Sequence, residues 1–164
     1  MIPIIGILGY SDSGKTLLVE VLCRELTRRG RRVGTLKHDG HGHVYDRAGS
    51  DTWRHRRGGA VASVVFSAGE MALFGAGGGI EAALRLLTSS TPELDLVLLE
   101  GFSQGAYPCI ILTKGGYPQP PGRVLASLPG LDNETSLGAN QLGRLADLIV
   151  NEAKRQVAAA AMDS

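Results

Sequence analysis

The sequence has few of the features that mark membrane, secreted or nucleic-acid-binding proteins. Its longest apolar stretches, such as residues 2–8 and 94–99, fall well short of the ~20 residues that cross a bilayer. No Lys- or Arg-led apolar segment opens the chain as a secretion signal would. A net charge of +1, from 17 basic and 16 acidic residues, provides no basic field for a polyanion. We therefore expect neither a membrane protein, nor a secreted one, nor a nucleic-acid partner.

Cysteine is equally scarce. Cys23 and Cys109 are the only two, and they show no Cys-x-x-Cys spacing. Both fall in apolar segments, so we expect two reduced core thiols in a cytoplasmic protein. The 164 residues suit one domain, which we expect over residues 1–157, with the alanine-rich segment 158–164 as a frayed tail.

Glycine is abundant, with 23 residues, about twice its usual share of ~7%. Apolar runs that predict buried strands alternate with segments of helical periodicity. We expect strands at 1–8, 32–37, 94–100 and 109–113, helices at 18–29, 51–57, 80–87 and 142–153, a hairpin from 61–66 and 71–74, and a loop at 115–122. This alternation predicts an α/β fold with an open, mostly parallel sheet, helices on both faces and a β-hairpin excursion.

A phosphate-binding motif follows the first strand directly. Residues 9–16 match G-x-x-x-x-G-K-[ST] and open the first helix, which indicates a three-layer fold of the P-loop NTPase type. Backbone N–H groups of such a loop cradle phosphates, while Lys15 reaches the β- and γ-phosphates and the Thr16 hydroxyl binds Mg²⁺. The expected nucleotide-binding residues are Gly9, Ser11, Asp12, Ser13, Gly14, Lys15 and Thr16.

Glu100 ends the apolar strand at 94–100 and is the expected second Mg²⁺ ligand. A parallel strand places its terminal acid beside the phosphate loop, where it can bind the metal through water. Asp95 lies at the other end of this strand, about 16 Å away at ~3.3 Å per residue. We therefore interpret Asp95 as a solvated carboxylate at the strand start.

All four histidines fall between residues 38 and 55, and three interpretations of this segment stay open. One is a transition-metal site, whose ligands would come from His38, His41, His43, Asp39 and Asp46. Another is an anion pocket, in which Lys37, the imidazoles and Arg54 bind a phosphorylated or oxyanionic ligand. The third is an ordinary solvated loop.

Three blocks of this sequence together resemble the MobB family of P-loop NTPases, the molybdopterin-guanine dinucleotide biosynthesis adaptor proteins. The blocks are residues 9–16, then Leu36-Lys37-His38 with residues 51–56 and Gly59-Ala60, and finally residues 95–102. They fall within residues 2–113. A phosphate loop alone would indicate only the superfamily, whereas the order and spacing of all three blocks narrow the resemblance to this family.

The resemblance implies a cytoplasmic, homodimeric GTP-binding protein with Mg²⁺ and weak GTPase activity. Such a protein assists molybdenum cofactor guanylyltransferase, the enzyme that joins GMP to molybdopterin, and its hairpin region contributes to the dimer. The residues that the resemblance places against cofactor or partner are Lys37, His38, Asp51, Trp53, Arg54 and Gly101.

One motif departs from the guanine-selective pattern. Guanine-selective P-loop GTPases present Asn/Thr-Lys-x-Asp after a late strand, and here residues 113–116, Thr-Lys-Gly-Gly, lack the Asp. The sequence therefore leaves the selectivity for the base open. Two other functions also stay open. One is a small-molecule kinase or ligase of the same fold, with a lid built from Arg54, Arg56 and Arg57. The other is a nucleotide-coupled metallochaperone that uses the histidines of residues 38–55.

Overall fold

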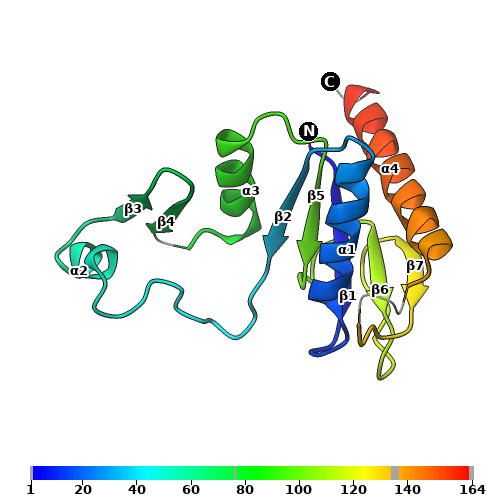
Figure 1. Ribbon diagram of the computed structural model, residues 1–164, viewed down its shortest axis with the longest axis horizontal. Helices are drawn as coiled ribbons and strands as arrows, with labels where there is room; N and C mark the ends of the chain where they lie inside the picture. The colour runs from blue at the N-terminus through cyan, green and yellow to red at the C-terminus, as the bar shows by residue number, and fades with distance from the viewer. Residues whose placement is uncertain (1, 76, 134–136, 163–164) are drawn as a thin grey trace. The chain divides into compact units, whose positions relative to one another are not determined.

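The computed structural model describes residues 2–75, 77–133 and 137–162. Contacts divide the chain into two compact units, one formed by residues up to His38 and from Leu87 onward, the other by Asp39–Leu86 (Figure 1). The boundary at Leu87 falls within helix α3 (Gly79–Ser90). We describe each unit by itself, and the expectation of one domain over residues 1–157 stays a prediction.

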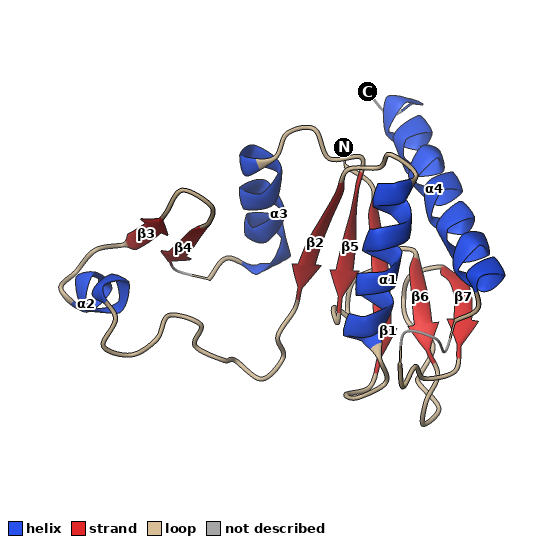
Figure 2. Cartoon of the chain, viewed as in Figure 1, coloured by secondary structure: helices blue, strands red, loops and turns tan. Residues whose placement is uncertain are grey.

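A five-stranded parallel sheet forms the centre of the larger unit (Figure 2). Its strands are β1 (Ile4–Gly9), β2 (Val33–Lys37), β5 (Leu96–Glu100), β6 (Cys109–Leu112) and β7 (Val124–Leu128), in the order β2-β5-β1-β6-β7. Strands β5 and β6 are buried along their whole length. Such burial on both faces explains why their sequences are continuously apolar, without alternation. The expected α/β fold with a mostly parallel sheet is confirmed.

Helices α1 (Lys15–Arg28) and α4 (Ala139–Met162) pack against each other and against β1. Their apolar faces meet the sheet in one core cluster. Its fully buried side chains include Ile5, Ile7, Leu18, Leu22, Leu26, Leu98 and Ile149. Burying a Leu or Ile side chain of this kind contributes roughly 1.5–3 kcal/mol. The core therefore fixes α1, and with it the phosphate loop that precedes α1.

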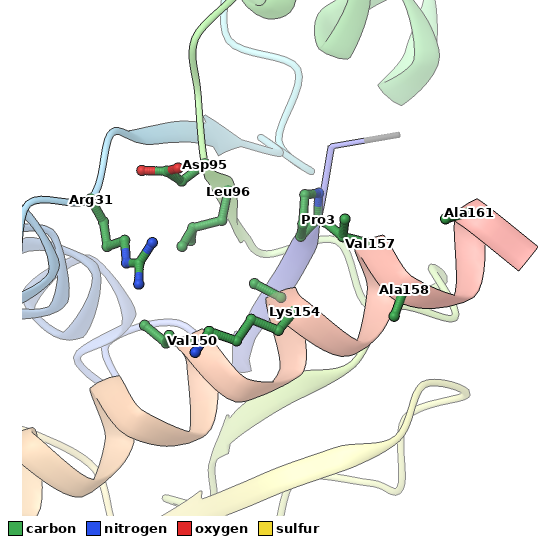
Figure 3. A pocket seen from close by; sticks show the side chains of 10 residues that line it. Pro3, Arg31, Asp95, Leu96, Val150, Lys154, Val157, Ala158 and Ala161 are labelled. Atoms are coloured by element: carbon green, nitrogen blue, oxygen red, sulfur yellow. The ribbon is translucent and has the colours of Figure 1, made fainter.

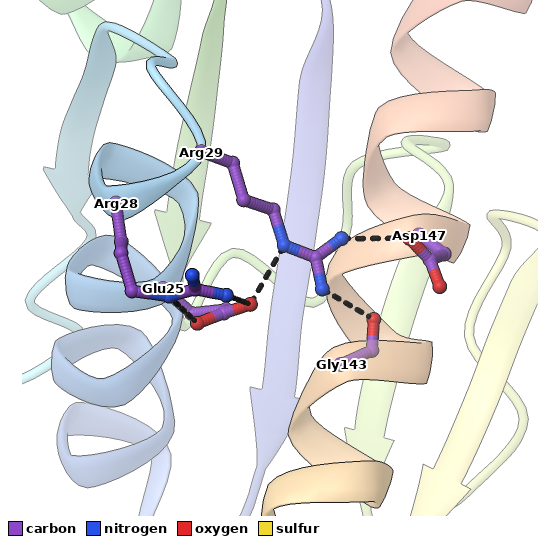
Figure 4. A network of polar contacts seen from close by, with 5 residues as sticks. All are labelled: Glu25, Arg28, Arg29, Gly143 and Asp147. Carbon is purple, nitrogen blue, oxygen red and sulfur yellow. Dashed lines mark hydrogen bonds and ion pairs between the residues drawn. The ribbon is translucent and has the colours of Figure 1, made fainter.

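Arg29, at the end of α1, joins the two helices through polar contacts (Figure 4). Its guanidinium donates to Glu25 Oε1 at 2.7 Å, to Asp147 Oδ1 at 2.6 Å and to the Gly143 carbonyl at 3.1 Å. Arg28 donates to both oxygens of the same Glu25 carboxylate, at 2.8 and 2.9 Å. These contacts hold the C-terminal end of α1 against α4.

The smaller unit contains helix α2 (Asp51–Arg57) and the antiparallel hairpin of β3 (Ala62–Phe66) and β4 (Met71–Gly75), which confirms the expected hairpin. Ser50 caps α2, because its hydroxyl accepts a hydrogen bond from the Trp53 N–H at 3.2 Å. Asp46 is only 3% exposed, and its Oδ1 accepts from the hydroxyls of Ser50 and Thr52. Asp46 therefore organises the turn into α2.

Two segments differ from the sequence-based expectations. Strand β7 was not expected, because this short edge strand is mostly half-buried and follows a proline-rich loop. The expectation of a frayed tail from residue 158 is wrong over residues 158–162, which continue α4 to Met162. Alanine has the highest helix propensity, so the alanine run extends the helix. Met1 and residues 163–164 lie outside the described residues.

Cys109 is buried and Cys23 is half-buried. Both are free thiols, and burial raises the pKa of each.

Within the described ranges, no helix has both the length and the apolarity needed to cross a membrane.

Replacing Glu25 by Gln should reduce stability at neutral pH but not in acid. Hydrogen bonds from Arg28 and Arg29 lower the pKa of Glu25 from 4.5 to about 2. The carboxylate therefore contributes stability that is fully present above its unfolded pKa and is lost as the pH falls toward its folded pKa. We expect Glu25→Gln to lower the melting temperature at neutral pH by a few degrees, and the difference from wild type to shrink as the pH falls below 4.5.

Glu20→Gln is the matched control on the same helix. Glu20 pairs with Arg24 at 3.0 Å, but both side chains are more than half exposed, so their pair contributes little. Thermal melts across the acid range should show a pH-dependent difference for Glu25→Gln alone. An equal difference at every pH would contradict the assignment of Glu25.

Candidate functional site

The loop between β1 and α1 has the backbone geometry of a phosphate cradle. Gly14 has φ = 90°, and a Cβ there would lie 2.4 Å from the Leu131 carbonyl oxygen. Asp12 has φ = 56°, the left-handed conformation that Asp tolerates better than most residues. The turn therefore requires glycine at position 14. At position 12 it requires a residue that tolerates the left-handed backbone conformation, as Asp does.

Ser13 lies within this loop and is fully buried, and its Oγ has no hydrogen-bond partner among the described residues. A Cβ at Gly9 would approach that oxygen to 2.5 Å, so the loop leaves no room for a side chain at position 9. An unpaired buried hydroxyl is costly unless a ligand or water satisfies it. Both features fit a loop built to surround an anion.

Lys15 reaches back over the loop, and its Nζ donates to the Tyr10 carbonyl at 2.6 Å. Burial lowers the pKa of Lys15, and the nearby Lys37 ammonium lowers it further, while Glu100 and Asp12 act in the opposite direction. The structure therefore places two cations within electrostatic reach of each other at the loop. Such a pair is stabilised by an anion between or beside them.

Glu100 lies at the carboxyl end of β5, only 7% exposed. Its Oε1 accepts from the Thr16 hydroxyl at 2.9 Å and lies 3.2 Å from the Lys37 ammonium. The parallel register puts Lys37 of β2 directly beside Glu100. The structure thus brings together the two residues predicted to bind Mg²⁺, and hydroxyl and carboxylate oxygens are ligands that this ion prefers. Their role as metal ligands stays a prediction.

His38 and Gly101 lie at the same edge of the sheet. The His38 N–H donates to the Glu100 carbonyl at 2.8 Å, and its ring lies 5.1 Å from that of Phe102. Gly101 has φ = 86°, and a Cβ there would approach the His38 carbonyl oxygen to 3.1 Å. Lys37, His38 and Gly101 therefore share one location in the larger unit.

Asp51, Trp53 and Arg54 lie in α2, within the smaller unit. Arg54 is exposed, and the Arg57 guanidinium covers the Trp53 ring at 5.4 Å. A cavity of about 240 Å³ is lined by Trp53, Arg56, Arg57, Ala60, Val61 and Gly75. The residues expected to meet cofactor or partner are therefore divided between the two units.

The acids of the histidine segment are engaged by the protein itself. Asp39 accepts from the backbone N–H groups of His41 and His43, and its Oδ2 also contacts the His43 ring and the Tyr45 hydroxyl. These hydrogen bonds, that from the His41 N–H foremost, hold the pKa of Asp39 well below its usual range. Across the residues described, no three His, Cys, Asp or Glu side chains form a metal-ligand group. The geometry does not favour the transition-metal interpretation.

A cavity of about 320 Å³ lies at the opposite, amino-terminal edge of the sheet (Figure 3). Its wall is formed mainly by apolar side chains of α4 with Pro3 and Leu96, and Arg31 and Lys154 contribute the cations. Asp95 is exposed there and accepts from the Arg32 N–H at 2.8 Å, which confirms it as a strand-start carboxylate. No residue of the phosphate loop lines this cavity.

Sequence reasoning missed Asp132, which follows β7. A cavity of about 410 Å³ beside the phosphate loop is lined by Asp12, Gly14, Lys15, Thr16, Leu17, Leu131 and Asp132. Asp132 also pairs with Lys114, Nζ to Oδ1, at 3.3 Å. The signal available in the sequence was the Thr113-Lys114 pair without its Asp, but nothing local connects that pair to residue 132.

Comparisons with known proteins point to one family. A model of the MobB family, described as molybdopterin guanine dinucleotide synthesis protein B, matches residues 4–126. The molybdopterin-guanine dinucleotide biosynthesis adapter protein of Haemophilus influenzae is 33% identical over 159 residues, covering 92% of this chain and 89% of the relative. The Escherichia coli adapter protein is 31% identical over 168 residues, covering 95% and 96%.

Solved structures extend the comparison to three dimensions. A crystal structure described as molybdopterin-guanine biosynthesis protein B (mobB) has a TM-score of 0.62 at 25% identity and covers 92% of this chain and 99% of that chain. The crystal structure of Bacillus subtilis MobB has a TM-score of 0.61 at 22% identity, a likeness of fold alone. Since the family model spans most of the sequence and these relatives match nearly end to end, the chain belongs to the MobB family.

Proposed function

We propose that this chain is a cytoplasmic GTP-binding adapter in the synthesis of the molybdopterin-guanine dinucleotide. The observation that carries the proposal is the convergence of Lys15, Thr16 and Glu100 at a glycine-shaped loop with an unpaired buried hydroxyl. The relatives are named as adapters of this synthesis, which supports the same role here.

The phosphate loop would bind the triphosphate through its backbone N–H groups and the Lys15 ammonium. Thr16 and Glu100 would hold Mg²⁺, which, when bound, offsets the charge of the phosphate oxygens. Lys37 adds a second positive charge at the same edge. Both contacts of Glu100, to Thr16 and to Lys37, are made by the oxygen Oε1, and we propose weak hydrolysis at most.

The residues outside the loop would serve the adapter role. Lys37 ends β2 and His38 follows it, and α2 presents an exposed Arg54 on a helix whose last turn is basic. Cationic side chains of this kind bind phosphorylated ligands such as molybdopterin through charge-assisted hydrogen bonds. We propose that they contact molybdopterin or the guanylyltransferase.

We also propose that the hairpin of β3 and β4 supports a homodimer. Several of its large apolar side chains are about half or more exposed: Val64, Val65, Phe66, Met71 and Leu73. A two-stranded hairpin has no core of its own, and two of its cross-strand pairs, Val64 with Leu73 and Phe66 with Met71, share one face. Exposed apolar side chains grouped in this way mark protein contacts. A second copy of the chain would bury it.

The kinase or ligase alternative receives less support. Of the three arginines that such a lid would need, Arg56 lies 3.6 Å from the buried Asp46 carboxylate and Arg57 covers the Trp53 ring. Both contacts would have to break before the side chains could close over phosphates.

Lys15→Ala and Arg54→Ala should separate nucleotide binding from the adapter role. Removing the Lys15 ammonium deletes charge-assisted hydrogen bonds of about 1.5–3 kcal/mol, so GTP affinity should fall about ten- to a hundredfold. Arg54→Ala should leave GTP affinity unchanged and lower dinucleotide formation by the guanylyltransferase. Calorimetric titration and a reconstituted synthesis assay measure the two effects.

Unchanged GTP affinity in a folded Lys15→Ala protein would contradict the phosphate-loop assignment. Full dinucleotide formation with Arg54→Ala would contradict the role of α2 but leave nucleotide binding standing.

Glu100→Gln should remove most of the Mg²⁺ dependence of GTP binding. The amide keeps an oxygen for the Thr16 hydroxyl and loses the charge that attracts the metal and pairs with Lys37. Titrations with Mg²⁺ and with a chelator should show a gain of about tenfold or more in wild type, equal to ~1.4 kcal/mol, and little gain in the variant. Asp95→Asn, at the other end of β5, is the control and should behave as wild type. If Mg²⁺ strengthens binding equally in both variants, Glu100 is a structural acid.

Phe66→Ser should weaken the homodimer. Phe66 is 79% exposed, so the substitution removes apolar contact area without a core defect in the single chain. Burial of a Phe side chain contributes roughly 1.5–3 kcal/mol, so its removal should raise the dimer dissociation constant about tenfold or more. Sedimentation equilibrium measures this constant. Val44→Ser, equally exposed but outside the hairpin, should leave the mass distribution unchanged. A monomeric wild-type protein would refute the dimer.

A further inference from the structure

The guanine-reading motif is incomplete in the sequence, and the structure brings an acid from another segment to its Lys. Residues 113–116, Thr-Lys-Gly-Gly, follow β6 and have no Asp two positions after the Lys. The loop after β7 brings Asp132 to Lys114, with Oδ1 3.3 Å from Nζ. A carboxylate thus stands beside the Thr-Lys pair although it comes from 18 residues further along the chain.

The ends of β6 and β7 are held together so that this arrangement is fixed. The Thr113 N–H and hydroxyl both donate to the Leu128 carbonyl, at 2.8 and 3.0 Å. Gly130 lets the methylene stem of Lys114 pack against the loop that follows β7. A Cβ at position 130 would lie 2.6 Å from Lys114 Cδ and 2.9 Å from Lys114 Cβ. The loop carrying Asp132 therefore packs on the Thr-Lys pair.

The same loop is bonded to the phosphate cradle. The Leu131 N–H donates to the Ser13 carbonyl at 3.0 Å, and Gly14 approaches the Leu131 backbone too closely for any side chain. Asp132, Lys15 and Thr16 line one cavity of about 410 Å³, within the ~300–1,000 Å³ typical of small-ligand sites. The Asp132 side chain is 80% exposed, so its carboxylate is accessible to a ligand there.

We propose that Asp132 reads the base of the bound nucleotide and selects guanine, an inference that rests on the proposed triphosphate binding. Guanine presents two adjacent donors, N1–H and the 2-amino group, and an ionised carboxylate accepts both. Adenine offers an acceptor at N1 and no donor at C2, so the carboxylate repels it. Lys114 pairs with Asp132, and its methylene stem would provide an apolar surface beside the base.

Asp132→Asn tests this assignment in the full chain, by competition of GTP, ITP, XTP and ATP against a fluorescent GTP analogue. Wild type should bind GTP about tenfold or more tightly than ITP, which lacks the 2-amino donor, and should reject ATP. In Asp132→Asn, GTP affinity should fall about tenfold or more and XTP affinity should rise. The Asn amide accepts from N1–H and donates to the xanthine 2-oxygen, a gain that a structural role for Asp132 would not produce.

Asp12→Asn is the matched control, because it removes another carboxylate from the same cavity. It should shift the affinities of all four triphosphates alike and leave their ratios unchanged. An unchanged GTP to XTP ratio in Asp132→Asn would overturn the base-reading role, as would equal binding of all four triphosphates by wild type, while triphosphate binding itself would stand. Failure of wild type to bind any triphosphate would overturn both proposals.

Discussion

The site depends on the parallel register of the central strands. Glu100 is the residue paired with Lys37 on one side and with Ile7 of β1 on the other, so the phosphate loop, the acid and the second cation end at the same level of the sheet. A shift of one residue in β5 would carry Glu100 to the opposite face of the sheet, away from Thr16. One carboxylate oxygen then serves both the Thr16 hydroxyl and the Lys37 ammonium.

The other half of the sheet builds a second, less regular edge. A register shift separates Cys109 from Ile110 in the pairing of β6 with β7. The Thr113 contacts to Leu128 compensate by joining the strand ends directly. Close approach at Gly14 and Gly130 then seats the loop after β7 against both the phosphate cradle and Lys114. Small residues thus bring together segments that no regular element connects.

Much of the fold, and the placement of Glu100 beside the loop at residues 9–16, could be predicted because their signals are local. Residues 9–16 form one continuous motif, and Glu100 ends an apolar run whose direction is fixed by the parallel sheet. Strand β7 escaped prediction because its five residues follow closely on the proline- and glycine-rich residues 115–122, which read as a loop, and the position of Asp132 was therefore missed as well. The helical alanines up to Met162 and the role of Asp46 beneath Ser50 and Thr52 depend on packing and hydrogen bonds that sequence patterns do not encode.

Lys37 occupies a junction in the chain as well as in the site. It ends β2, and His38, bonded through its N–H to the Glu100 carbonyl, is the last residue of the larger unit before the segment that leads to α2. Any ligand that takes the Glu100 oxygen competes with this ammonium at the start of the connecting segment. Thermodynamic linkage makes the competition reciprocal. A partner that draws Lys37 away from Glu100 raises the affinity of the Glu100 oxygen for a cation, and a cation bound there raises the affinity of the partner for Lys37 by the same factor.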